Sequence, residues 1–451
     1  MAQHTKTRFP PEAIREDFIP KDAYYSREFA ALEEERLWPR VWQMVGRLEE
    51  FPKVGDYLTY DILGDSILIV RNAPDSLKAY HNVCMHRGRR LLDGCGSVQE
   101  ITCRFHGWRY NLNGENTRIV DAADWGGRLT PEDTHLREVL IDTWGGWVFI
   151  NMDPEAESLA SFLSPMQDYL DKFEFESLRY HWFKTTILPS NWKTAVEFFN
   201  EFYHVQQAHP QVLPFTNDYS KSGGFGKHGM MWFEAEGSVP LSRSPRLPAK
   251  TEPDYRNFVL DFVERYHTEL EAMVTTRHYQ AAQRLRTEVE ASASPTEVLT
   301  KWMQFRLEAA EADGSGWPKD LPFDYINRSG LDWHVFPNFV FLHGTVDGLL
   351  GYRARPNGDD PESCIFDVFS LQRFGPGKAP VLNREFHPDW RAAKWPRIYA
   401  QDFVNIPEVQ KGMHSRGFTG SRPNPVQERA ITHFHRTLRS FIADGGANAD
   451  R

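Results

Sequence analysis

Short runs of alternating hydrophobic and polar residues follow a polar N-terminal arm. The run TYDILGDSILIV, residues 59–70, alternates and carries β-branched side chains, and turn-forming residues follow it at 72–75. The apolar run at 147–151 comes directly after the pair Gly145-Gly146, which allows the chain to turn before a strand. These patterns predict a small all-β domain over residues 41–160.

Elsewhere the hydrophobic spacing is mostly helical. Residues 26–42 place Phe29, Leu32 and Leu37 near one face, which predicts a helix that packs on a later domain. Residues 252–312 predict three long helices whose mixed charges are typical of a solvated face; the alternatives are an active-site cover or a subunit contact. Residues 330–375 return to strand-like alternation, and a last helix is expected near the C-terminus.

Length and charge limit the classes of protein that fit. The chain has 451 residues, enough for two or three domains, with 41% hydrophobic and 25% charged residues. Its net charge of −10 gives no general attraction to nucleic acid or to anionic membranes. The N-terminus lacks the apolar core of a signal peptide, and no run of eighteen apolar residues predicts a membrane span.

Two short hooks of metal-binding residues lie in the predicted β domain. They are Cys84-x-His86 and Cys103-x-x-His106, with sixteen residues between them. Each hook pairs one Cys with one His, so the two Cys can meet at one iron and the two His at the other, the ligand set of a Rieske [2Fe–2S] centre. A glycine after each hook lets backbone N–H groups turn toward the sulfides, and Trp108 can cover the cluster from water.

A structural zinc site with the same ligands is the alternative. Zinc sites favour like ligands within each hook, and the hooks here are mixed. The pattern therefore favours the Rieske cluster. The other two cysteines, Cys95 and Cys364, are then expected to be free thiols, which favours a reducing cytoplasm.

A second set of metal-binding residues lies in NWKTAVEFFNEFYHVQQAHP. Asn191 is a typical N-cap, and the helix it starts is predicted to carry Glu201 and His204, which share a face. On an unbroken helix His209 would point about 140° away from His204. Pro210 disfavours helical conformation at His209, so a loosened helix would let both histidines reach one metal. Two His and one carboxylate form the facial triad of non-haem Fe(II) oxygenases, which leaves positions open for O₂.

The carboxylate of such a triad must come from elsewhere in the chain. Residues 395–418 offer Asp402 and Glu408, and Ile406-Pro407 is predicted to end the helix that carries Asp402. The residues alone leave both carboxylates open.

Taken together, the hooks and the motif Glu-x-Tyr-His-x₄-His at 201–209 resemble the Rieske non-haem iron oxygenases, that is, the ring-hydroxylating large (alpha) subunits and their monooxygenase relatives. The late pattern Gln-Asp-x₅-Glu-x-Gln-x-Gly resembles the family motif whose Asp binds iron, which makes Asp402 the expected third ligand. The family more often has Asp where Glu201 stands and often Asn where Phe198 stands, so no Asn role is carried over. The three motifs occur in the family's order and span nearly the whole chain.

The resemblance implies an α+β fold. A small all-β Rieske domain (41–160) would accompany a helix-grip catalytic domain (161–451), an antiparallel sheet flanked by helices, with a helical insertion at 252–312. The N-terminal arm and helix (1–40) would pack on the catalytic domain. The family also implies a homotrimer, with or without a small beta subunit.

The resemblance also implies an activity. Electrons from a ferredoxin and/or an NAD(P)H-dependent reductase would pass through the [2Fe–2S] cluster to a mononuclear Fe(II) held by His204, His209 and Asp402. There O₂ would be activated to oxygenate an apolar substrate, aromatic by family and by the Phe-rich composition, through cis-dihydroxylation, monohydroxylation or oxidative dealkylation. Glu201 would bridge His204 to His106 of the partner subunit and so carry electrons between subunits.

Two other functions are weighed against this one. An electron-transfer protein would not need the long chain beyond the Rieske domain or the second iron motif. A zinc-stabilised binding protein would be colourless. The segment GFGKHG, residues 224–229, matches G-x-G-x-x-G, but the polar residues before it predict a mobile loop and not a dinucleotide site, so electrons must come from another protein.

Overall fold

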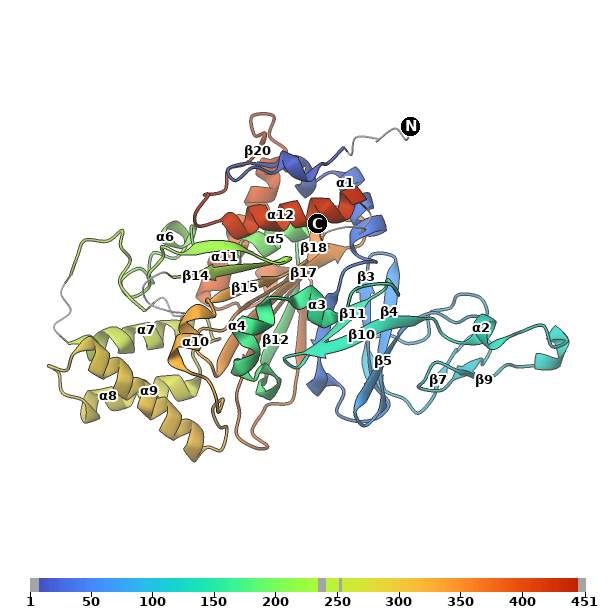
Figure 1. Ribbon diagram of the computed structural model, residues 1–451, viewed down its shortest axis with the longest axis horizontal. Helices are drawn as coiled ribbons and strands as arrows, with labels where there is room; N and C mark the ends of the chain where they lie inside the picture. Colours follow the sequence, from blue (N-terminus) through green and yellow to red (C-terminus); the bar gives the residue numbers. More distant parts are fainter. Residues whose placement is uncertain (1–7, 234–240, 251–253, 445–451) are drawn as a thin grey trace. The chain divides into compact units, whose positions relative to one another are not determined.

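The computed structural model describes residues 8–233, 241–250 and 254–444, which divide into two compact units (Figure 1). Residues 33–162 form one unit, and the residues up to 32 together with those from 163 onward form the other. The first boundary falls inside the predicted N-terminal helix. Helix α1 (Arg27–Leu32) gives way to a π-helical segment at Glu33–Leu37. Pro39 follows closely, and a proline disfavours helical conformation in the residue before it.

The smaller unit is built from two antiparallel sheets. The larger sheet has seven strands in the order β2-β11-β10-β5-β4-β3-β6, and the smaller has the order β7-β8-β9. Their bounds are β2 (Gln43–Arg47), β3 (Asp56–Ile62), β4 (Asp65–Ala73), β5 (Ser76–His81), β6 (Cys95–Ser97), β7 (Ile101–Thr102), β8 (Arg109–Tyr110), β9 (Asn116–Arg118), β10 (Glu138–Trp144) and β11 (Trp147–Asn151). One short helix, α2 (Pro131–Thr134), precedes β10.

Tight hairpins set the register of the large sheet. Strands β4 and β5 are joined within the turn predicted at 72–75. Strands β10 and β11 are joined by Gly145 and Gly146, whose φ angles are +56° and +80°. Two consecutive positive φ angles match the twist of the flanking strands, and glycine adopts them without steric cost. The strand predicted at 147–151 is confirmed as β11.

The larger unit contains an eight-stranded sheet in the order β13-β14-β15-β16-β17-β18-β12-β19. All neighbouring strands run antiparallel except β12 and β19. The bounds are β12 (Arg179–Leu188), β13 (Lys221–Phe225), β14 (His228–Trp232), β15 (Asp332–Val335), β16 (Phe339–Leu342), β17 (Gly348–Asn357), β18 (Asp360–Gln372) and β19 (Arg384–His387). A separate pair joins β1 (Ile19–Pro20) to β20 (Gly420–Ser421).

Helices flank this sheet and complete the α+β fold. They are α4 (Met166–Leu170), α5 (Trp192–Glu197), α6 (Val205–Ala208), α7 (Tyr255–Glu269), α8 (Thr276–Glu288), α9 (Pro295–Ala312), α10 (Phe323–Arg328), α11 (Arg397–Met413) and α12 (Arg429–Asp444); α3 (Leu159–Leu163) spans the second boundary between the units. The three helices predicted at 252–312 are confirmed as α7, α8 and α9, which lie together in Figure 1. No helix in these described residues is both long and apolar enough to cross a membrane.

The expectation of a mobile loop at GFGKHG is wrong. Residues 221–232 form the hairpin β13–β14, which extends the sheet by pairing with β15. Helix α12 packs on it: the Ala430 amide donates to Ser222 Oγ, and a side chain at Gly224 would collide with the His433 ring. The glycines therefore permit close packing of a helix on a strand, a tertiary requirement that the local polar sequence conceals.

The prediction that Ile406-Pro407 ends a helix is also wrong. Helix α11 runs from Arg397 to Met413 with Pro407 inside it. Its second half is fixed by Gln410, which accepts hydrogen bonds from the Asn191 amide (2.9 Å) and donates one to the Tyr24 carbonyl (3.0 Å). Buried tertiary contacts beyond the proline thus offset the hydrogen bond that proline removes from the helix.

Candidate metal centres

The two hooks of the smaller unit adopt the same local geometry. The Cys84 amide donates to the Arg89 carbonyl (2.8 Å), and the Cys103 amide donates to the Trp108 carbonyl (2.9 Å). Each hook turns at a glycine of positive φ, 72° at Gly88 and 74° at Gly107. Two matching turns present two Cys and two His as a pair of equivalent arms, as two irons with two ligands each require.

The four predicted cluster ligands are brought together, sulfur side inward. Cys84 and Cys103 are buried, whereas His86 is half-buried and His106 is exposed. The two imidazole rings lie 4.7 Å apart, and Trp108 stacks on His86 at 5.2 Å. Thiolates in a buried pocket and imidazoles toward solvent fit a cluster that receives and passes electrons at its histidine side.

Tyr110 is a cluster-site residue that sequence reasoning missed. Its hydroxyl lies 3.3 Å from Cys84 Sγ and accepts a hydrogen bond from the Met85 amide (3.1 Å). With its acceptor side taken by that amide, the hydroxyl proton is directed at the sulfur. Burial raises the pKa of Cys84, and the Tyr110 hydrogen bond acts in the opposite direction by favouring the thiolate. A tyrosine seven residues after Cys103 belongs to no metal-binding sequence motif. Only the fold therefore reveals that Tyr110 lies beside Cys84.

In the larger unit the predicted helix from Asn191 is shorter than expected. Asn191 caps it as predicted, with its side chain accepting from the Lys193 amide, but α5 ends at Glu197. Glu201 and His204 therefore lie in a turn and not on a common helix. The four-residue helix α6 separates His204 from His209, which leaves helical conformation with φ −127° and ψ 50°, and the following proline disfavours the helical region at that position. The chain thus leaves helical conformation before Glu201 and again at His209. The centroids of the two imidazole rings lie 5.2 Å apart.

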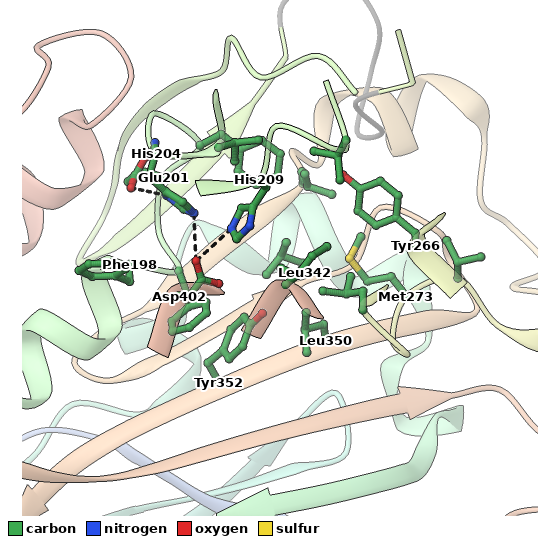
Figure 2. A pocket seen from close by; sticks show the side chains of 18 of the residues that line it. Phe198, Glu201, His204, His209, Tyr266, Met273, Leu342, Leu350, Tyr352 and Asp402 are labelled. Atoms are coloured by element: carbon green, nitrogen blue, oxygen red, sulfur yellow. Dashed lines mark hydrogen bonds and ion pairs between the residues drawn. The ribbon is translucent and has the colours of Figure 1, made fainter. Parts of the chain in front are cut away.

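His204, His209 and Asp402 converge on one point (Figure 2). Asp402 Oδ1 lies 3.0 Å from His209 Nε2 and 3.6 Å from His204 Nε2. Spacings near 3 Å are those of ligands that share a metal at bond lengths of about 2.1 Å. Glu408, the alternative ligand, is exposed on the same helix and pairs with Lys411. Of the two carboxylates that the sequence left open, it is therefore Asp402 that lies beside both histidines.

Both histidines turn Nε2 toward this point, because Nδ1 of each ring is bound to an oxygen. His209 Nδ1 donates to Gln401 Oε1 (2.9 Å), and His204 Nδ1 donates to Glu201 Oε1 (2.6 Å). Metal-binding histidines are held in this way, with one N–H fixed by an oxygen and the other nitrogen free for the metal. Asp402 Oδ1 is buried and accepts no hydrogen bond from the described residues, as a metal ligand would not. The donor set fits a mononuclear iron.

Glu201 holds His204 through both carboxylate oxygens. Oε2 accepts from the His204 amide (3.0 Å) while Oε1 accepts from the ring. Burial lowers the pKa of His204, but the charges of Glu201 and Asp402 outweigh it and raise that pKa to about 9. The site therefore carries surplus negative charge, which favours a cation at its centre. Gln401 was not predicted as a site residue, although it opens the late motif.

An apolar pocket extends from these three side chains. In Figure 2 the ligands lie at one end, Leu342 and Leu350 of the sheet form the floor, and Tyr266 and Met273 stand opposite. Its lining comprises Phe198, Phe199, Glu201, Phe202, His204, Val205, His209, Val212, Phe262, Tyr266, Leu270, Met273, Val274, Leu331, Leu342, Thr345, Leu350, Tyr352, Ile398 and Asp402. Among the described lining residues, those that are charged or histidine are His204, His209, Asp402 and Glu201, and the rest are neutral.

The strands at 330–375 contribute little aromatic lining to the pocket. Phe336, Phe339 and Phe341 are buried in the core away from the pocket. Helix α7 and the turn after it supply lining residues instead, including Phe262 and Met273. The insertion at 252–312 is therefore not only a solvated face, because part of it lines the pocket beside His204, His209 and Asp402.

Two family models match this chain, and each covers one of the two candidate metal centres. Residues 172–444 match the family model of the ring hydroxylating alpha subunit (catalytic domain), and residues 41–124 match that of the Rieske [2Fe–2S] domain. The chain belongs to the ring-hydroxylating alpha-subunit family. As a Rieske non-haem iron oxygenase alpha subunit it carries a Rieske [2Fe–2S] cluster and a mononuclear iron.

Relatives of this alpha subunit act on different classes of substrate. The glycine betaine monooxygenase oxygenase subunit of Chromohalobacter salexigens is 31% identical over 203 residues, 45% of either chain. The match thus spans less than half of that relative. Among solved structures, the quaternary ammonium Rieske monooxygenase CntA in complex with L-carnitine covers 96% of this chain and 99% of its own, with a TM-score of 0.64 and 18% identity.

A second solved structure shares the fold to a similar degree. Naphthalene 1,2-dioxygenase from Rhodococcus sp. bound to indole covers 96% of this chain and 95% of its own, with a TM-score of 0.60 and 18% identity. The two structures confirm the predicted α+β architecture, an all-β Rieske domain with a sheet-and-helix catalytic domain. At this identity they indicate the fold and not the substrate.

Proposed function

We propose that this chain is the terminal component of an oxygenase that takes electrons through a Rieske cluster and inserts oxygen from O₂ into an apolar substrate. The observation that supports it best is the triad of His204, His209 and Asp402 at one end of an apolar pocket. A bound iron supplies a site that activates O₂ once electrons reach it. We assign the cluster to Cys84, His86, Cys103 and His106 in the 33–162 unit, and the iron to the triad in the larger unit.

The residues around the triad do three things in this proposal. Gln401 and Glu201 fix the two imidazoles in orientation, so no reorganisation is needed when the metal binds. Phe198, Phe202 and Tyr352 exclude water from the substrate's surroundings, which limits the escape of reactive oxygen species. The pocket then holds the reacting carbon beside the ligands by apolar contact alone.

Metal analysis and EPR test the two centres directly. Protein purified anaerobically and reduced with dithionite should show a Rieske-type signal and about three irons per chain, two in the cluster and one in the triad. A matched variant, Cys103→Ser, should lose the signal and about two irons while the triad keeps its own. Zinc in place of iron, with no such signal, would contradict the proposal and return the hooks to a structural role.

An apolar substrate fits the neutral part of the pocket. Among the described lining residues the distal polar groups are hydroxyls, and none is Lys or Arg. The Thr345 hydroxyl is occupied by the Met273 carbonyl (2.6 Å), and the Tyr266 hydroxyl by Thr216 (3.1 Å). A substrate carboxylate would be desolvated there without a cationic partner, which is costly. We therefore propose a neutral hydrocarbon-like substrate, aromatic by the shape and character of the lining.

Oxidative demethylation of a quaternary ammonium is the second candidate. It is favoured by the aromatic lining, since Phe198, Phe202, Phe262 and Tyr352 could hold a trimethylammonium group by cation–π contacts. The relatives named for glycine betaine and carnitine also point to it. Both of those molecules carry a carboxylate, for which the described lining offers no cation.

Turnover assays separate the two candidates. With a generic NADH-dependent reductase and ferredoxin, we expect oxygen uptake and hydroxylated product with naphthalene or biphenyl. With carnitine or glycine betaine we expect no formaldehyde above background. Formaldehyde release with no aromatic product would overturn the apolar substrate and favour demethylation.

We also propose a homotrimer in the cytoplasm, with a ferredoxin and/or reductase as the electron donor.

A further inference from the structure

The distal wall of the substrate pocket depends on a strained turn between α7 and α8. Leu270, Met273 and Val274 of this turn line the pocket. Glu271 and Met273 have φ angles of +52° and +62°, a region that costs energy for residues other than glycine. A turn of this kind persists only when its surroundings hold it, so the contacts that hold it determine where the wall stands.

The turn between β16 and β17, residues 343–347, provides those contacts. Thr345 Oγ1 donates to the Met273 carbonyl (2.6 Å). A side chain at Gly348 would come within 2.1 Å of that carbonyl oxygen, so the two backbones abut. The β16–β17 turn is itself strained, because Val346 has a φ of +68°. Two strained turns thus brace each other at the end of the pocket.

Asp347 ties this pair of turns to the helices of the insertion. Its carboxylate accepts hydrogen bonds from His278 Nε2, from Arg277 (2.8 Å) and from Arg306 (3.2 Å), and Asp347 and His278 are fully buried. Arg277 and His278 belong to α8, and Arg306 to α9. Arg306 also donates to the Thr345 carbonyl (2.6 Å). One carboxylate therefore connects both helices to the sheet.

The protonation states of the group are consistent with this role. The Thr275 amide donates to His278 Nδ1 (3.1 Å), which leaves the ring proton on Nε2 for Asp347. Burial and the nearby Arg306 lower the pKa of His278 to about 4. Burial raises the pKa of Asp347, but His278, Arg306 and Arg277 outweigh it and keep the carboxylate ionised. At neutral pH an anionic acceptor thus faces a neutral donor and two cations.

We propose that Asp347 is a positioning residue that sets the length of the substrate pocket, and hence which substrates fit, by anchoring the turn that carries Met273 and Val274. The proposal rests on the function given above only in taking this pocket as the substrate site. Without the carboxylate charge, Arg277 and Arg306 lose their buried partner and the two turns lose their brace. The wall at Met273 then withdraws, short substrates are held less well, and longer ones gain room.

The variant Asp347→Asn tests the proposal, with Asp367→Asn as a matched control. Asp367 is also buried and pairs with Arg353 (2.7 Å) and Arg355 (2.8 Å), but it lies on β18, which contributes no described residue to the pocket. Both variants remove one buried charge that two arginines share. Both should therefore lower the midpoint of thermal unfolding, and only Asp347→Asn should change the pocket.

Two readouts separate positioning from general damage. Hydrogen exchange of the amides at 270–275 should accelerate in Asp347→Asn and not in Asp367→Asn. Calorimetric binding of the alkylbenzene series from toluene to hexylbenzene should shift toward longer chains in Asp347→Asn, with toluene weakened on the order of tenfold. With turnover, KM for short substrates should rise more than kcat falls.

The outcomes distinguish the wall from the proposed function. An unchanged chain-length profile in Asp347→Asn, or the same shift in Asp367→Asn, overturns the positioning role. If the wild-type chain binds no alkylbenzene, the substrate class fails, and hydrogen exchange alone decides the anchor: equal exchange at 270–275 in wild type and Asp347→Asn overturns it. If Asp347→Asn does not fold, Thr345→Val removes the neighbouring brace, and unchanged exchange in that variant counts against the proposal.

Discussion

Replacing Asp402 with Ala is expected to empty the mononuclear site and leave the cluster intact. Iron should fall from about three to about two per chain, because the two histidines alone are a poor binding site for Fe(II). Oxygenation should fall by on the order of a thousandfold or more, since the remaining cluster has no position open to O₂. The measurement combines iron analysis, EPR of the reduced cluster and oxygen uptake in the presence of a reductase.

The control for this variant lies on the same helix. Glu408 was the alternative ligand, and it is exposed six residues further along α11. Glu408→Ala should keep three irons and full activity. Loss of iron in Glu408→Ala with none lost in Asp402→Ala would reverse the assignment. Loss of the Rieske signal in Asp402→Ala would show that the variant damages the whole chain and not one site.

The candidate ligands could be predicted because short motifs encode them locally. Cys84-x-His86 and Cys103-x-x-His106 place unlike ligands on two turns, and the structure adds only the matching glycine turns and Tyr110. The chemistry of a centre resides in its donor atoms, and those are visible in a sequence. The residues that orient the donors are visible only when the fold brings them close, as with Gln401 at His209.

The errors at the second centre have a common physical cause. The helix expected to carry Glu201 and His204 ends at Glu197, and the helix expected to end at Pro407 continues. In both places tertiary contacts outweigh local propensity: after α5 the Asn200 side chain is bound to the His334 ring, and beyond Pro407 the Gln410 side chain is buried against α5. The hairpin at GFGKHG is a third case, since α12 covers glycines that read locally as a loop.

The role of the insertion could not be settled from its pattern. Mixed charges at helical spacing describe the outward face of α7 to α9 correctly, and they say nothing of the inward face. The inward face carries Phe262 and Met273 to the pocket and buries Arg306 against Asp347. A buried arginine cannot be distinguished from an exposed one in a sequence. The buried ion pairs between Asp347 and the helices of the insertion therefore could not be predicted.

Glu201 is the residue whose replacement should separate metal binding from turnover. We propose that its carboxylate bridges His204 to His106 of the partner subunit and carries electrons from the cluster to the iron. Glu201→Ala should keep about three irons per chain and the reduced-cluster signal, because none of the metal ligands is removed. Turnover should fall by at least about a hundredfold, since the orientation of His204 and the path through it are both lost.

The conservative variant sharpens this test. Both oxygens of Glu201 act as acceptors, one for the His204 ring and one for the His204 amide, and a glutamine can satisfy only one of them. Glu201→Gln should therefore retain iron and still lose most activity. The matched control is Glu428→Gln, which replaces a carboxyl group in the cavity that Glu201 also lines while leaving the contacts of His204 in place.

The decisive measurement is a single turnover without a reductase. Chains with a reduced cluster are mixed with O₂ and substrate, and oxidation of the cluster is followed by absorbance. In the wild type and in Glu428→Gln the cluster should be oxidised as product forms. In Glu201→Ala and Glu201→Gln it should stay reduced while the iron remains bound, because the electron has no path to the iron. Full activity in Glu201→Ala would refute the bridge, and slow turnover with lost iron would instead make Glu201 a support for His204 alone.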